Sequence, residues 1–126
     1  MACLIWLSAL AVAVVIGLFV SRRQNRRLKE AESKGMKLLL KNLSPRQREQ
    51  YREFGYFDVT GSDTSRRYRI FHGRFSNIRE LGADGRLEIG KCFMPEGDLV
   101  AGDCMLAQKI ALENRELSAL RVALPF

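Results

Sequence analysis

The residues of this chain that could do chemistry are few and widely spaced. It has one histidine, His72, and three cysteines, Cys3, Cys92 and Cys104. A structural zinc site needs four clustered ligands, commonly supplied by C-x-x-C pairs, and no such pair is present. An enzyme would need Cys92, His72 and Asp103 to converge, and no nucleophile elbow or oxyanion loop accompanies them. We therefore expect a strand-end histidine, a buried Cys92 thiol, no metal, no cofactor and no enzymatic activity.

Two polar loops share some residue types with ligand-binding loops. The segment GADGRLEIG, residues 82–90, has glycines but neither G-x-G-x-x-G nor a Walker lysine. The segment PEGDLVAGD, residues 95–103, contains three carboxylates without the spacing of an EF-hand. We expect Asp103 to be the N-cap of the helix that follows, which accounts for its position without a cation.

A third polar segment, RRYRIFHGR at residues 66–74, alternates as a strand would. Two arginines and a phenylalanine fall on one face, with Tyr68 opposite. Arginines interleaved with aromatic residues can stack on bases and bind phosphate. They can equally pair with Glu80 and Glu88 on neighbouring strands, the outcome that we expect. We call this candidate interaction surface the arginine face; it comprises Arg67, Arg69, Phe71 and Arg74.

Positive charge is concentrated in one segment. The chain carries a net charge of +7, and residues 21–43 contain eight basic and two acidic residues. Residues 44–126 contain 13 basic and 12 acidic residues, so this part is nearly neutral. A nucleic-acid-binding domain carries its basic patch on its folded part, and this distribution therefore argues against nucleic acid as a partner.

The first 20 residues are apolar except for Ser8 and Gly17. A helix of about 19 residues spans about 28 Å, close to the hydrocarbon core of a bilayer. A cleaved signal peptide would need a positive region before the apolar core, which is absent here, so we expect an uncleaved anchor. The remaining alternative is that Met36 is the true start. The expected anchor residues are Trp6, Phe19, Arg22, Arg23, Arg26 and Arg27.

The arginines after the apolar segment predict its orientation. Basic flanks stay in the cytoplasm and attract anionic headgroups, so we expect the N-terminus outside and the C-terminal domain inside. Residues 1–20 are the predicted transmembrane helix and residues 21–43 a basic helical linker, with a break at Gly35. Residues 44–126 are the predicted domain.

Within this domain the pattern predicts a helix, a small antiparallel sheet and a second helix. Ser44, Pro45 and Gln47 form an N-terminal capping box, and Gly55 ends that helix, whose Tyr51 and Phe54 could face a core. Three or four short strands follow in meander order, with Phe57 and Val59 on one face, a bulge near Asn77 and a turn at Asp84-Gly85. In the final helix we expect Leu106, Ile110 and Leu117 to form the buried stripe, broadened by Met105 and Leu112. A second short helix is expected at residues 118–124, stopped by Pro125. The fold class is α+β.

Two blocks of the sequence resemble a known group of proteins. They read FDVTGSDTSRRYRIFHGRFSNIREL and CFMPEGDLVAGDCMLAQKIALE. These blocks are similar to those of a group of small uncharacterised bacterial proteins, common in proteobacteria, over about residues 43–123. The resemblance implies a discrete domain. It does not imply an activity, because the group has no known one.

Together these patterns favour an interaction module anchored in the bacterial inner (cytoplasmic) membrane by a single span. We expect an accessory or scaffold subunit of a larger membrane protein complex. The alternative is a regulatory module that binds a small ligand or nucleic acid through Arg67 and Arg69.

Overall fold

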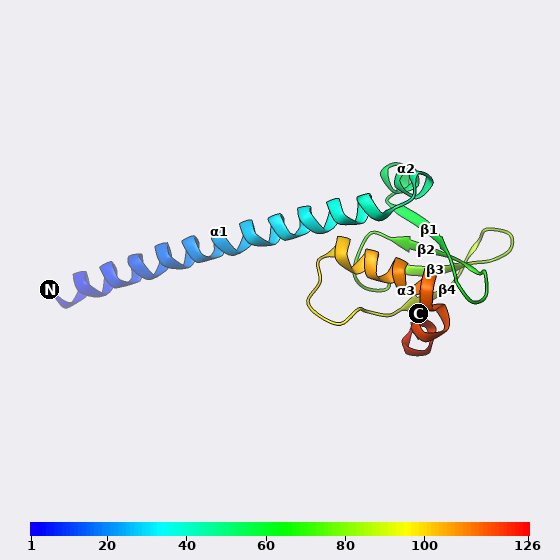
Figure 1. Ribbon diagram of the computed structural model, residues 1–126. Helices are drawn as coiled ribbons and strands as arrows, with labels where there is room; N and C mark the ends of the chain where they lie inside the picture. The colour runs from blue at the N-terminus through cyan, green and yellow to red at the C-terminus, as the bar shows by residue number, and fades with distance from the viewer. The chain divides into compact units, whose positions relative to one another are not determined.

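The computed structural model describes Met1 and residues 6–126 in full, and residues 2–5 only as part of a helix, so the Cys3 thiol lies outside the described side chains. Most contacts fall within one of two units, Met1–Ser33 and Lys34–Phe126. The elements are α1 Ala2–Asn42, α2 Pro45–Phe54, β1 Tyr56–Thr60, β2 Arg67–Phe71, β3 Ile78–Leu81, β4 Leu87–Cys92, α3 Ala101–Val122 and β5 Leu124–Pro125 (Figure 1). The predicted α+β class is confirmed.

The first unit consists of the N-terminal part of α1. This helix contains one stretch that is long and apolar enough to cross a membrane, and its most apolar window has no residue buried in the structure. By length and composition alone, this exposed helix has the properties that a membrane anchor and a signal sequence share.

Helix α2 begins and ends as predicted. The Ser44 side chain accepts a hydrogen bond from the Gln47 amide, and the Gln47 side chain returns one from the Ser44 amide. Pro45 occupies the first helical turn, and Gly55 closes the helix with a left-handed φ of 74°. These local interactions satisfy backbone groups that a helix end leaves unpaired.

The sheet is a five-stranded antiparallel meander in the order β1-β2-β3-β4-β5. It has one strand more than expected, because residues 124 and 125 pair with Lys91 and Cys92 instead of continuing a helix. Proline is tolerated on an edge strand, where it does not need to donate to a neighbour. The sheet has a register irregularity in the stretch where a bulge was expected, but it lies between Arg79 and Leu81 and not at Asn77.

Helix α3 covers the sheet, but its start and its buried stripe differ from the prediction. Val100 is the N-cap, and Asp103 lies within the first turn. Ile110 and Leu117 are about half exposed. Leu106, Met105 and Leu112 are buried, as predicted. The fully buried row along the helix has a spacing of four residues and consists of Cys104, Gln108, Leu112 and Glu116. The backbone is non-helical at Arg115, where two helical segments join.

The core lies between α3 and the inner face of the sheet. Phe57 and Val59 are buried there, as their alternation predicts. The last turns of α1 also reach this core, since Leu39 is 0% exposed, and Leu43, the residue after the helix, is 3% exposed. The other buried hydrophobic members are Tyr68, Ile70, Ile78, Phe93, Met105, Leu106, Leu112 and Ala119.

The prediction that Gly35 breaks the helix is wrong. Helix α1 continues through Gly35, which is buried. A Cβ on Gly102 of α3 would lie 2.5 Å from the amide nitrogen of Met36 and would overlap the Gly35 backbone. The two glycines therefore allow α1 and α3 to cross with their backbones in contact. This packing offsets the cost of about 1 kcal/mol that glycine imposes within a helix.

Candidate functional site

Three residues of the arginine face lie on the outer side of the sheet. Strand pairing places Asp58 opposite Arg69, Thr60 opposite Arg67 and Tyr56 opposite Phe71. These pairs share one face because Phe57, Val59, Tyr68 and Ile70 point to the core on the other. The outer face of β1 and β2 is therefore an alternating row of polar, charged and aromatic side chains.

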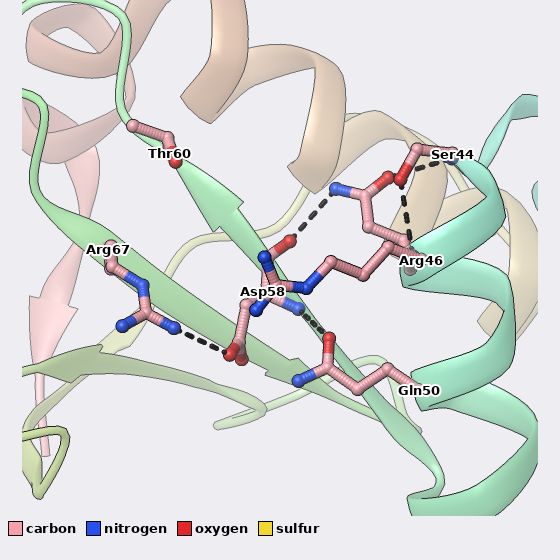
Figure 2. Close-up of a pocket in the computed structure, with 7 residues that line it drawn as sticks. Ser44, Arg46, Gln50, Asp58, Thr60 and Arg67 are labelled. Carbon is pink, nitrogen blue, oxygen red and sulfur yellow. Dashed lines mark hydrogen bonds and ion pairs between the residues drawn. The ribbon is translucent and has the colours of Figure 1, made fainter.

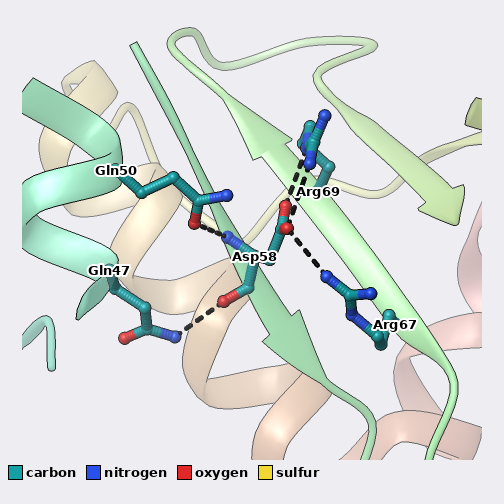
Figure 3. A network of polar contacts seen from close by, with 5 residues as sticks. All are labelled: Gln47, Gln50, Asp58, Arg67 and Arg69. Atoms are coloured by element: carbon teal, nitrogen blue, oxygen red, sulfur yellow. Dashed lines mark hydrogen bonds and ion pairs between the residues drawn. The ribbon is translucent and has the colours of Figure 1, made fainter. Parts of the chain in front are cut away.

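Asp58 is the counter-ion of this face. Arg69 donates to both of its oxygens, from Nε at 2.7 Å and from a terminal nitrogen at 3.1 Å, and Arg67 approaches from one side at 3.2 Å (Figure 3). Burial by itself raises the pKa of Asp58, but the hydrogen bonds and charge of Arg69 outweigh it, so its pKa is lowered.

The predicted pairing of these arginines with Glu80 and Glu88 is wrong. Glu80 pairs with Arg66, one residue before β2, at 3.1 Å. Glu88 contributes its backbone carbonyl, which accepts from Arg79 at 3.4 Å. The reason is register, because Asp58 is the residue directly across from Arg69.

Aromatic rings continue the face beyond the ion pairs. The Arg69 guanidinium lies over the Tyr56 ring, 3.9 Å from its centroid. Tyr56 in turn stacks on Phe54 and meets Phe71 edge to face. Phe54, which could have faced the core, is 56% exposed. Arg69 is thus held both by a bidentate carboxylate and by a ring face.

Arg74, the fourth predicted member, belongs to a different set of contacts. Its guanidinium donates to the carbonyl of Leu99 at 2.9 Å and to Asp98 at 3.3 Å. The Cys104 thiol donates to the Arg74 carbonyl at 3.6 Å. Arg74 therefore ties the loop after β2 to the segment before α3, and no described contact joins it to Asp58.

Helix α2 closes the free edge of β1. The Gln47 side chain donates to the Asp58 carbonyl and Gln50 accepts from the Asp58 amide, both at 2.9 Å (Figure 3). Two side-chain amides thus replace the missing neighbouring strand at this residue. Unpaired edges invite association with other chains, and this contact blocks the centre of β1.

A cleft of about 350 Å³ lies between α2 and this strand pair. In Figure 2, Arg46 reaches from α2 toward Asp58, and Arg67 reaches toward the same residue from β2. Sequence reasoning missed Arg46 and Asp58, because neither belongs to the basic segment or to the alternating stretch around β2. The lining residues are Ser44, Arg46, Gln47, Gln50, Asp58, Thr60 and Arg67.

A second polar network surrounds Glu116, which is fully buried. Its carboxylate accepts from the Asp63 amide at 2.8 Å, from the Thr64 amide at 2.7 Å and from the Tyr68 hydroxyl at 2.6 Å. The Thr64 hydroxyl donates as well. A Cβ on Gly61 would overlap this carboxyl group. These hydrogen bonds hold the loop between β1 and β2 against α3, so the network stabilises the fold.

Hydrogen bonding outweighs burial at this carboxylate. Burial by itself raises the pKa of Glu116, but the bonds from Thr64 and Tyr68 lower it overall. The pKa of Tyr68 is raised, first by its burial and then by its bond to Glu116. The sequence signal for this site was weak, because a glutamate on α3 and the GSDTS segment lie more than 50 residues apart.

The histidine and the cysteines that were considered as catalytic or metal-binding residues do not form one cluster in the structure. His72 Nδ1 is 2.7 Å from the Tyr51 hydroxyl, and burial raises the pKa of that hydroxyl. Cys92 and Cys104 are free thiols, and burial raises the pKa of Cys104. Within the described residues, no group of three or more His, Cys, Asp or Glu side chains could hold a metal ion.

The predicted anchor residues all lie on α1. Trp6 and Phe19 are 76% and 69% exposed. The four arginines are exposed on the turns that follow, and Arg26 pairs with Glu30 at 3.1 Å.

Comparisons with protein-family models, with curated proteins and with solved structures found no match to this chain.

Proposed function

We propose that this chain is a membrane-anchored interaction module, an accessory or scaffold subunit of a larger membrane protein complex. The observation that carries the proposal is that one helix, α1, contains both the apolar segment and turns packed in the domain core. The buried side chains of Leu39, in the helix, and Leu43, directly after it, make this end of α1 part of the folded domain. The domain is therefore tied to the apolar segment by helix residues.

The basic flank that follows the apolar segment supports the orientation of the anchor. Four arginines lie just after the segment, at positions 22, 23, 26 and 27. Such a distribution keeps the domain in the cytoplasm, and the arginines contribute about 1 kcal/mol each toward anionic headgroups. The compartment that fits this proposal is the bacterial inner membrane.

Membrane extraction and the mass of the intact chain test the anchor. The full chain, expressed with a C-terminal tag, should resist alkaline carbonate and keep its N-terminal residues. A variant that begins at Ser21 should appear in the soluble fraction and serves as the control. Release of the full chain by carbonate, or a mature form beginning near Ser21 or Met36, would contradict the proposal.

Gentle solubilisation tests the interaction. The full chain should co-purify in a constant ratio with an integral membrane protein, because a subunit has a fixed stoichiometry. Replacing residues 2–20 with a leucine-alanine helix of equal length separates partner recognition by the domain from recognition by the anchor. Purification of the full chain by itself, as a monomer in its micelle, would contradict a subunit role.

A further inference from the structure

We propose that the cleft between α2 and β1 binds a phosphate group of a small anionic ligand, with Arg46 and Arg67 as the binding cations. The site goes beyond the anchoring and subunit role, and it does not depend on that role. It belongs to the folded domain, whose overall charge is nearly neutral. The proposal therefore depends on the charges of the residues around the cleft and not on the net charge of the domain.

The charges around the cleft do not cancel. Asp58 is the single acidic residue among those that line it. Its carboxylate is already neutralised by Arg69, which donates to both oxygens. Arg67 adds one bond to the same carboxylate and keeps 52% of its side chain exposed. Two positive charges are thus left over, and a phosphate monoester dianion carries the charge that matches them.

Arg46 has its whole donor capacity free. Its side chain makes no hydrogen bond or ion pair within the part of the chain that the structure describes, although it lines the cleft and points toward Asp58 (Figure 2). A guanidinium offers five N–H donors in a planar fork that fits phosphate oxygens. Arg46 and Arg67 both line the cleft, one from α2 and the other from β2, so a phosphate bound there can contact both.

The walls of the cleft supply further donors, and its volume is large enough for a small ligand. The Thr60 hydroxyl lines it without a partner among the described residues. The Ser44 oxygen accepts from the Gln47 amide, which leaves its hydroxyl hydrogen to donate. A volume of about 350 Å³ is at the low end of small-molecule sites, which span about 300–1,000 Å³. A phosphate with a short substituent fits this volume.

Titration with inorganic phosphate tests the site in the full chain, held in nanodiscs of neutral phosphatidylcholine. The NMR signals of the arginine Nε–H groups report on the cleft. Phosphate should shift the Arg46 and Arg67 signals saturably, and Arg46→Gln should weaken binding about tenfold because it removes a charged donor. Arg52→Gln, the same change on α2 outside the cleft, should leave the affinity unchanged.

The variant Asp58→Asn should change the phosphate affinity in the opposite direction to Arg46→Gln. It removes the negative charge beside the ligand, so phosphate should bind several-fold more tightly; near-ultraviolet circular dichroism checks that the variant is folded. A response that does not saturate, or equal losses in Arg46→Gln and Arg52→Gln, would overturn the proposal, because either result indicates general attraction to positive charge.

A second arm of the experiment distinguishes a lipid headgroup from a soluble ligand as the source of the phosphate group. Nanodiscs containing phosphatidic acid, without added phosphate, should shift the two arginine signals if the ligand is a lipid headgroup. Shifts with soluble phosphate alone indicate a soluble ligand. In either arm Arg46→Gln must reduce the response, and shifts in neither arm would overturn the proposal.

Discussion

The two arginines that pair with Asp58 differ in how firmly they are held. Arg69 makes two bonds to the carboxylate and lies over the Tyr56 ring, and its side chain is 20% exposed. Arg67 makes one bond and is 52% exposed. A lysine can replace a single exposed ion pair but cannot reproduce a bidentate, stacked contact. Their individual contributions to stability should therefore be unequal.

Arg69→Lys should lower the free energy of unfolding by about 1–2 kcal/mol, and Arg67→Lys by less than about 0.5 kcal/mol. Urea unfolding of the full chain in detergent measures both. Near-ultraviolet circular dichroism is a suitable signal, because all three tyrosines lie in the domain. Equal losses in the two variants would contradict the unequal roles assigned to these residues.

Glu116→Gln should cost about 2–3 kcal/mol, because an amide nitrogen would then face donors that now meet a carboxylate. Glu113→Gln is the matched control, one turn earlier on α3. Glu113 is more exposed than Glu116 and forms its ion pair with Lys109, one turn away; its long-range contact is a single 3.3 Å hydrogen bond from the Gln47 side chain. The control should change stability by less than about 0.5 kcal/mol. The same unfolding measurement applies, and a loss in the control as large as in Glu116→Gln would argue against a special role for the buried network.

The pKa values of Asp58 and Glu116 are lowered, so acid should destabilise the domain. A carboxyl whose pKa is lower in the folded state binds its proton more readily when unfolded. Its stabilisation is present above the unfolded pKa of about 4 and is lost as the pH falls through the folded value. Unfolding curves between pH 7 and pH 2 should show this loss, with a smaller pH dependence in Asp58→Asn and in Glu116→Gln. A wild-type slope in both variants would place the acid-sensitive groups elsewhere.

At the scale of elements, the crossing of α1 and α3 depends on glycine. Gly102→Ala should destabilise the domain by at least about 2 kcal/mol, because backbone atoms of α1 cannot yield to the added Cβ. Gly17→Ala is the matched control within a helix, since a Cβ there meets nothing within 4 Å. Hydrogen exchange of α3 amides measures the effect. An unchanged protection pattern in Gly102→Ala would show that the helices can separate without cost.

Element boundaries were predictable where the signal was local. The capping box at Ser44 and the left-handed Gly55 needed only neighbouring residues, and both are as expected. Gly35 misled the prediction because a glycine in a helix has two meanings, a break or a close contact. The partner that decides between them, Gly102, lies 67 residues further along the chain.

For the whole molecule, the arginines after the apolar segment should control orientation. Replacing Arg22, Arg23, Arg26 and Arg27 with asparagine should give a mixed or inverted topology, since the positive flank would be weakened. Reporter fusions at the C-terminus measure this in cells. Replacing the basic residues at positions 46, 48, 52 and 66 with asparagine serves as the control and should preserve the orientation. An unaltered topology in the first variant would contradict the predicted determinant.

The sequence by itself determined most of the elements and their order, with strand β5 as the exception. The apolar segment, the basic flank, the capped helix and the alternating strands are each coded within about 20 residues, over distances where periodicity and local hydrogen bonds act. Tertiary structure alone decided the partners of the polar groups. Asp58 with Arg69, Glu116 with the GSDTS loop and Arg46 at the cleft are brought together by strand register and helix packing. These long-range pairings follow from how the core closes, which no local pattern records.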